Sequence, residues 1–359
     1  MAEDKNYLYL GGDVHKHSST ITVMDEDGKR LVTEKLPNTR EAFVRLLNSF
    51  GDNYFRAVLE AGRNWGVIYD LLENLPKVEN VVLANPFKVR AIADAKLKTD
   101  TIDSITLANL LRTDYIPAVF VPPKEIRIKK YLLRHRCFLV TMQTRIKNRI
   151  HIILERNHIP VPSVTDLFGQ RGRHFLDNLT LPEDENYLLK AHLELLDYVK
   201  EQIKEITEII KDEFDQQPEV ALLKTIPGIG DVFAPLIALE ICDIKRFSNY
   251  KRLWSYAGLV PTTYASGKRV YHGGLIKHAN KWLRWAFVEA AHSSIRTSFY
   301  FGAYYNHKKM TIGIPAAMIA TARRLAKIVY YVLKEKRPYI EFEPRLSSIY
   351  GSHRGSGQG

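Results

Sequence analysis

The sequence predicts a mixed α/β domain over residues 1–120, a helical coiled-coil arm over 121–216, a mainly α-helical domain over 217–340 and a flexible tail over 341–359. Three patterns support this division. Short apolar runs separated by turns indicate strands in the first part, and apolar residues at steps of three and four indicate long helices in the second. In the third part, glycine turns separate shorter apolar helices, and the tail is rich in Gly and Ser.

Strands and helices alternate in the first domain. Helices are expected from Asn38, as the N-cap of a capping box with Glu41, from Trp65 and from Lys98. Three consecutive strands joined by short turns predict an antiparallel meander, and the whole order is that of an RNase H-like (RuvC-like) domain. We expect the strands at 7–16, 19–24, 29–36, 54–59 and 80–83.

Four acidic residues stand where this fold would gather them. Asp13 and Glu60 end the first and fourth strands, and Asp100 and Asp103 lie three apart on the first turn of a helix. Each has a plainer explanation, because Gly-Gly-Asp is a common turn and acids near a helix N-terminus interact favourably with its dipole. Together they predict a metal site, since clustered carboxylates repel one another unless cations neutralise them. We expect two Mg²⁺ ions, about 4 Å apart, in a site for phosphoryl transfer.

The composition points to a polyanionic partner. The 359 residues include 52 Lys and Arg against 40 Asp and Glu, a formal charge of +12 that favours DNA or RNA. The two cysteines, Cys137 and Cys242, show no zinc-ligand spacing and predict a reducing, cytoplasmic location. No run approaches the roughly 18 apolar residues of a spanning helix, and the first residues are not apolar, so we expect no membrane association.

Residues 124–156 are predicted to form an amphipathic helix with a basic exposed face, because ten Lys and Arg accompany only two Glu. We expect this face to contact phosphates, with a merely solvated surface as the alternative. A second helix, from about Glu185 to Asp215, carries a heptad seam that includes His192 and packs on the first helix or on another subunit. The basic face consists of Lys129, Lys130, Arg134, Arg136, Arg145, Lys147 and Arg149.

The stretch 222–239 predicts a helix, a Gly-x-Gly turn and another helix. Gly228 and Gly230 would leave backbone N–H groups and a helix N-terminus free to meet a phosphate, as in a helix-hairpin-helix element. A purely structural pair of helices is the alternative.

Two sets of motifs resemble one known family, the DEDD (RuvC-like) insertion-sequence transposases related to the Piv DNA invertase. Small departures from that family occur at Gly12, His15, Ser104 and Ala279, and none of them touches the four acids. The runs that resemble its N-terminal domain are 12–16, 60–62 and 98–104. Those similar to its C-terminal domain are Gly258–Pro261, Ser266–Gly267, Lys277, Asn280 and Leu283–Arg284.

The resemblance implies an enzyme that cuts and rejoins DNA with Mg²⁺ on the four acids. Ser266 matches the catalytic serine of the family, although a Ser-Gly pair alone predicts only a turn. Its attack on a DNA phosphate would give a covalent phosphoserine and would need no ATP. The serine and the acids lie in different domains, so they would meet only after docking, within one subunit or between two. Lys268, Arg269, Lys277 and Arg284 are expected to contact nucleic acid.

The resemblance also implies partners: donor and target DNA, a structured bridge RNA as guide, and a homodimer or homotetramer. Two other functions fit the residues. A RuvC-like endonuclease that uses water would keep cleaving after the change Ser266→Ala. A non-catalytic nucleic-acid-binding protein would keep every activity after Asp13→Asn.

Overall fold

The computed structural model describes residues 6–93, 99–266 and 269–341. The chain divides into two compact units, residues 1–124 and residues 125–359. The division of the chain into four segments stays a prediction, because the helical arm and the helices after it share the second unit.

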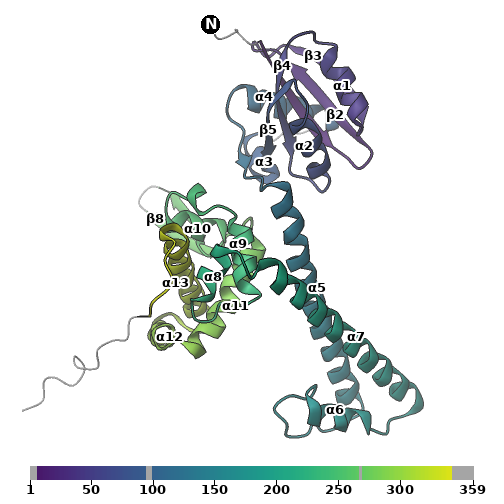
Figure 1. The fold of residues 1–359 in the computed structure, drawn as a ribbon, viewed down its shortest axis with the longest axis vertical. Helices are drawn as coiled ribbons and strands as arrows, with labels where there is room; N and C mark the ends of the chain where they lie inside the picture. The colour runs from purple at the N-terminus through teal and green to yellow at the C-terminus, as the bar shows by residue number, and fades with distance from the viewer. Residues whose placement is uncertain (1–5, 94–98, 267–268, 342–359) are drawn as a thin grey trace, which may run out of the picture. The chain divides into compact units, whose positions relative to one another are not determined.

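The first unit is built on a six-stranded mixed sheet with the order β3-β2-β1-β4-β5-β6 (Figure 1). The antiparallel meander predicted for the first three strands is confirmed, since β2 pairs antiparallel with both β1 and β3. β1, β4 and β5 are parallel neighbours, and β6 adds an antiparallel edge that the sequence did not predict. The strands are β1 (Tyr7–Val14), β2 (Ser18–Met24), β3 (Arg30–Pro37), β4 (Tyr54–Glu60), β5 (Val78–Ala84) and β6 (Ala118–Val119).

Helices cover both faces of this sheet. α1 (Arg40–Asn48) and α2 (Trp65–Glu73) pack on one face, where Leu10, Phe43 and Phe55 are buried in a shared core. α4 (Asp100–Arg112) packs on the other face against Val58 and Ala84 of β4 and β5. α3 (Pro86–Ile92) follows β5 directly, with its N-cap at Asn85.

The capping box predicted at the start of α1 is wrong. Thr39, not Asn38, is the N-cap, and its hydroxyl accepts a hydrogen bond from the backbone N–H of Ala42. The Asn38 side chain instead links two neighbouring segments, because it accepts from the Ser19 hydroxyl and donates to the carbonyl of His15. A tertiary contact therefore outweighs the local capping preference at Asn38.

The second unit begins with two long helices that run antiparallel, α5 (Lys124–Arg156) and α7 (Glu183–Phe214). Their contacts run in opposite order along the two helices: Arg156 pairs with Glu185, Arg136 with Thr207 and Lys129 with Glu213. α6 (Gln170–Asp177) lies in the connection between them. Antiparallel pairing buries the apolar seams of both helices in one core.

Two details of this helix pair correct the sequence predictions. Leu193, only 3% exposed, fills the seam position expected for His192, whose ring nitrogen Nδ1 lies 2.6 Å from the carbonyl of Leu188. Lys130 was expected on the exposed basic face, but it is 6% exposed and its ammonium lies 3.1 Å from the carboxylate of Glu240. An apolar-polar period assigns faces, but it does not tell a solvent-facing cation from one that faces a buried acid.

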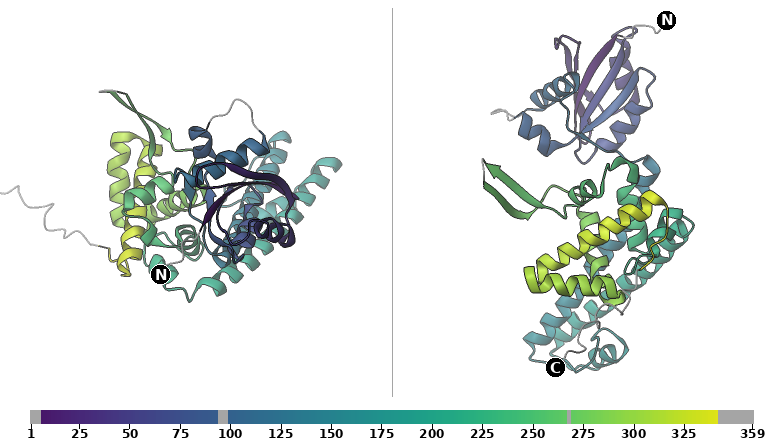
Figure 2. Two further views of the ribbon diagram at one scale, coloured as in Figure 1. Left: turned by 90° about the horizontal axis from the view of Figure 1, so that it is seen from above. Right: turned by 90° about the vertical axis from the view of Figure 1, so that its left-hand side faces the viewer.

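The remainder of the second unit is helical apart from one hairpin. α11, α12 and α13 pack against one another, and α12 was not predicted from the sequence. The hairpin of β7 and β8 extends away from the helices (Figure 2). The elements are α8 (Pro218–Lys224), α9 (Phe233–Ile241), η1 (Ile244–Arg246), α10 (Tyr250–Tyr256), β7 (Pro261–Ser266), β8 (Arg269–Leu275), α11 (Lys281–Thr297), α12 (Phe299–Ile312) and α13 (Ile314–Glu335).

Within residues 6–93, 99–266 and 269–341, no helix is both long and apolar enough to cross a membrane. Both cysteines are free, and burial raises the pKa of the Cys137 thiol to about 11.

Candidate metal and phosphoryl-transfer site

Two of the predicted acids lie at neighbouring strand ends. The parallel pairing of β1 with β4 ends at Gly12 and Leu59, and Asp13 and Glu60 are the next residues of the two strands. Since side chains alternate along a strand, both carboxylates lie on the sheet face that carries Gly11 and Val58. That face is covered by α4.

Close packing of α4 brings the other two acids to the same place. A Cβ atom on Gly11 would come within 2.5 Å of the Ala108 backbone nitrogen, so only glycine lets the helix approach this closely. The buried Ser104 and Thr22 hydroxyls, 2.8 Å apart, join the helix to β2. Thr99 caps the helix by accepting a hydrogen bond from the Ile102 N–H, which places Asp100 and Asp103 on the first turn.

All four predicted acids line one cavity of about 440 Å³, together with His15 and Thr99. Asp100 also borders a second cavity of about 480 Å³, lined by residues of β2 and β3 that include Thr20 and Lys35. The site is therefore an open pocket at the end of the sheet, large enough for a phosphate group with its counter-ions.

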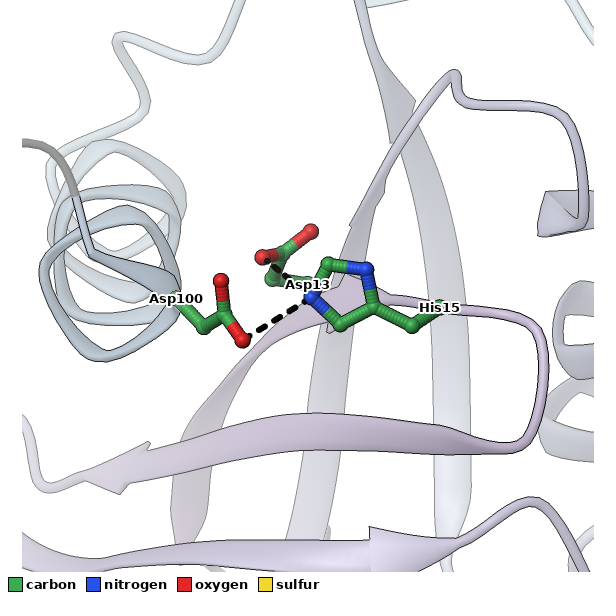
Figure 3. A group of neighbouring side chains, drawn as sticks. All are labelled: Asp13, His15 and Asp100. Atoms are coloured by element: carbon green, nitrogen blue, oxygen red, sulfur yellow. Dashed lines mark ion pairs between the residues drawn. The ribbon is translucent and has the colours of Figure 1, made fainter.

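His15 is a member of the pocket that the sequence analysis treated only as a departure from a family pattern. Its Nε2 atom lies 3.0 Å from Asp100 Oδ2 and 3.4 Å from Asp13 Oδ2 (Figure 3). The turn between β1 and β2 fixes its backbone, because the His15 N–H donates to the carbonyl of Ser18. Its position two residues after Asp13, at a strand end, was the signal available in the sequence.

The donor set suits a hard divalent cation. Single ligand atoms of Asp13, His15 and Asp100 all lie within 4.8 Å of one another. Asp13 is 15% exposed and Asp100 is 47% exposed, so water can complete a coordination shell. Carboxylate and water oxygens are the ligands that Mg²⁺ takes, and an imidazole nitrogen suits transition metals as well. The residues present thus fit a divalent metal ion.

The fifth predicted catalytic residue, Ser266, lies in the second unit. It is the last residue of β7, and its backbone pairs with Arg269 at the tip of the hairpin. Gly267 and Lys268 lie outside the described residues, as do the side chains of Ser266 and Arg269. Within the second unit, the serine lies at the tip of the hairpin. The four acids precede it in the sequence by more than 160 residues and belong to the first unit.

The base of this hairpin is anchored by partly buried polar contacts. Asn280 caps α11, and its amide also donates to Glu240 at 2.9 Å and to the Tyr256 hydroxyl at 3.2 Å. Arg284 donates to the carbonyls of Ala257 and Ile276, on the two sides of the hairpin. Arg284 is therefore engaged with the protein's own backbone.

The two glycines of the predicted phosphate-binding turn differ. A Cβ atom on Gly228, at φ +89°, would come within 2.5 Å of the Ser294 backbone nitrogen on α11. Gly230 has nothing near its missing side chain and is exposed. Close packing rather than phosphate access explains Gly228, while Gly230 is open to solvent.

The predicted basic contacts also fall into two groups. Lys130, Arg134, Arg136 and Lys129 are engaged by Glu240, Thr207 and Glu213 within the second unit. Arg145, Arg149 and Lys277 are exposed, and Lys147 lies with its ammonium 5.0 Å from the centre of the Phe168 ring. A phosphate-binding role for these residues stays a prediction.

A mixed α/β domain whose acids share one cavity, followed by a helical region, fits the class of DEDD transposases. A model of the DEDD transposase domain of IS110 elements matches residues 10–159. A second model, described as transposase of the IS116/IS110/IS902 family, matches residues 220–306. The chain belongs to this family of transposases, and it is an enzyme of DNA transposition.

Several individual proteins are similar to this chain along nearly their whole lengths. The 44.8 kDa protein of insertion element IS116 from Streptomyces clavuligerus is 23% identical, with 96% of this chain and 99% of that protein covered. The pilin gene-inverting protein of Moraxella bovis is 28% identical, with 92% and 97% covered. The transposase of IS1111A from Coxiella burnetii is 24% identical, with 93% and 92% covered.

Proposed function

We propose that this transposase cuts and rejoins DNA strands at an RNase H-like site formed by Asp13, Glu60, Asp100 and Asp103, with Ser266 as the nucleophile. The observation that carries the proposal is the single cavity that all four acids line at the ends of β1, β4 and α4. The strand order, with a meander followed by parallel strands, supports an RNase H-like fold. Relatives named for transposition and for DNA inversion support recombination as the outcome.

The four acids would hold two Mg²⁺ ions, which supply charge neutralisation for the phosphodiester and its oxygens. The protein itself holds the metal-binding carboxylates in position. Asp13 and Glu60 are held by the sheet and Asp100 and Asp103 by the first turn of α4, so the carboxylates keep their positions without reorganisation. His15, between Asp13 and Asp100, limits the movement of both carboxylates.

Ser266 would attack the DNA phosphorus through its Oγ atom. A new P–O bond forms to the serine, the P–O bond to the neighbouring nucleotide breaks, and the proton of the serine hydroxyl ends on the oxygen that leaves. The reverse step, with the hydroxyl of another strand as attacker, releases the serine and seals the new junction. The number of phosphodiester bonds is conserved, so no ATP is consumed.

The partners follow from this chemistry and from the charge of the chain. Donor and target DNA are the substrates, and the basic residues still exposed on α5 are suited to a structured bridge RNA as guide. Exchange of several strands calls for a homodimer or homotetramer, with α5 and α7 as an arm that contributes a coiled-coil contact. The reaction takes place in the cytoplasm, where the DNA substrates lie.

Trapping the covalent intermediate tests the proposal. Purified protein is incubated with Mg²⁺, DNA carrying the ends of the element and RNA from its flank, and a protein–DNA adduct is measured on a denaturing gel. We expect the adduct with the parent protein and with Ser255→Ala, an exposed serine on α10, and its loss with Ser266→Ala.

Two results would replace the proposal with another function. Full cleavage by Ser266→Ala, without any adduct, indicates an endonuclease that uses water. Unchanged activity of Asp13→Asn in every assay indicates a protein that binds nucleic acid without catalysis at these acids.

A further inference from the structure

The three helices at the end of the second unit carry an unusual excess of positive charge. Between Lys281 and Lys334 there are nine Lys and Arg and a single acid, Glu289, although the whole chain has 52 Lys and Arg against 40 Asp and Glu. One side of α13 is buried against the core through residues such as Leu325 and Val329. Lys308, Arg324 and Lys327 of α12 and α13 remain partly exposed beside this buried side.

Aromatic rings alternate with these cations along α12 and α13, which lie side by side (Figure 1). The Arg324 guanidinium lies 5.0 Å from the ring centres of both Tyr300 and Tyr304. The Lys308 ammonium lies 5.9 Å from the centre of Tyr304, on its own helix. Each ring is thus bordered by a positive charge that can meet a phosphate while the ring meets a base.

The pattern continues one turn further along α13. The Lys327 ammonium lies 4.8 Å from the ring centre of Tyr250 on α10 and 6.0 Å from that of Tyr331. Tyr331 is 40% exposed, and Phe299 at the start of α12 is 72% exposed. We call this surface the α12–α13 face; it is defined by Phe299, Tyr304, Lys308, Arg324, Lys327 and Tyr331.

Acids border the face but do not neutralise it. Glu341 accepts hydrogen bonds from the Ser298 hydroxyl and the Tyr300 N–H, so its carboxylate is used as a cap at the start of α12. Glu335 lies at the other end, on the last turn of α13. Between these two ends, α12 and α13 contain no acidic residue.

We propose that the α12–α13 face binds single-stranded DNA during strand exchange. Cations alone would suit any polyanion, but exposed rings placed between cations suit unpaired bases, which stack on aromatic side chains while the backbone follows the positive charge. Duplex DNA hides its base faces and would use only the cations. The inference rests on the proposed function, since breaking and rejoining strands is what exposes unpaired DNA.

Binding is measured by fluorescence anisotropy with a labelled oligothymidylate of about 16 nucleotides, without Mg²⁺ and in the Ser266→Ala background, so that no chemistry occurs. We expect Tyr331→Ala to weaken binding about tenfold. Lys327→Gln is expected to lower the slope of log affinity against log salt by about 0.7. The matched controls on α7, Tyr198→Ala and Lys204→Gln, are 64% and 66% exposed and should leave both quantities unchanged.

Three outcomes would overturn the inference. Unchanged affinity of both face variants removes the face as a binding site. An equal loss for duplex DNA with Tyr331→Ala removes the single-strand assignment, and about tenfold tighter binding of the matching RNA removes the assignment to DNA. Equal melting temperatures of parent and variants exclude unfolding as the cause. Formation of the Ser266 adduct is measured separately, so a loss of DNA binding at the α12–α13 face can be distinguished from a failure of the proposed chemistry.

Discussion

Four carboxylates of the first unit and one carboxylate of the second show opposite uses of the same chemistry. In the first unit, Asp13, Glu60, Asp100 and Asp103 share an open cavity, and Asp100 is 47% exposed. In the second unit, Glu240 is 1% exposed. Its Oε1 atom accepts from Arg134 at 2.8 Å, and its Oε2 atom contacts Lys130 at 3.1 Å and Asn280 at 2.9 Å.

The difference lies in where the compensating charge comes from. Burial alone would raise the pKa of Glu240, but the charges of Lys130 and Arg134 hold that pKa below its ordinary value. The chain thus neutralises this acid permanently. The pocket of the first unit instead gathers four acids in one open cavity, and clustered carboxylates repel one another unless cations neutralise them. A buried acid paired with cations of the same chain stabilises the fold, whereas acids gathered in an open cavity are suited to binding a metal ion.

The largest effect is expected from Asp13→Asn, which removes a proposed ligand while keeping the shape of the side chain. Strand transfer should fall on the order of 10³-fold, because a metal ion stabilises the transition state by several kcal/mol and each 1.4 kcal/mol is a factor of ten. The rate of strand transfer at saturating Mg²⁺ measures it. The free energy of unfolding should stay within about 0.5 kcal/mol of the parent value or rise, because removing one negative charge reduces the repulsion among the clustered acids.

The matched control for that change is Asp27→Asn, an exposed acid in the turn after β2. It should leave the rate unchanged. Equal rates for the parent and Asp13→Asn would contradict the contrast between the four acids of the first unit and Glu240.

Glu240→Gln is expected to act on stability instead. It leaves Lys130, whose side chain is 8% exposed, without its anionic partner, and breaking a buried pair in this way costs about 3 kcal/mol. Urea unfolding followed by circular dichroism measures the change, with the exposed Glu219→Gln on α8 as the control. A loss below about 1 kcal/mol would show that the buried group is not a stabilising pair.

Gly228→Ala sharpens the comparison at the turn between α8 and α9. The left-handed φ of +89° and the close approach to Ser294 on α11 predict a loss of about 2 kcal/mol in the free energy of unfolding. Gly230→Ala, with open space around it, should change that free energy by less than about 1 kcal/mol. Equal effects of the two changes would mean that packing does not distinguish these glycines.

The smallest effect concerns pH. Because the folded pKa of Glu240 is lowered, its contribution to stability is complete above the unfolded pKa, about 4.3, and is lost as pH falls through the folded pKa. The stability difference between the parent and Glu240→Gln should therefore be constant near neutral pH and shrink below about pH 4. Urea midpoints across this range measure it, and a difference independent of pH would contradict the assignment.

The sequence predicted the order of strands and helices in the first unit, apart from α3 and β6, because alternation and apolar period are local signals. It also identified the four acids that line the cavity, since strand ends and helix starts can be located from the chain alone. It missed His15, whose approach to Asp100 depends on how closely α4 packs against Gly11.

The errors have two causes. Asn38 and Lys130 were assigned from local preference, and partners distant in sequence determine where both side chains point. α12 lacks a clear apolar period because only Phe301 among its residues is buried. Contacts between distant segments are the feature that is hardest to predict from a single sequence.

Calorimetric titration with Mn²⁺, a spectroscopically visible substitute for Mg²⁺, tests most directly whether the acids of the first unit bind divalent metal. We expect saturable binding by the parent and by Asp27→Asn, and its loss in both Asp13→Asn and Asp100→Asn. Undiminished binding by these two variants, or no binding by the parent, would contradict it.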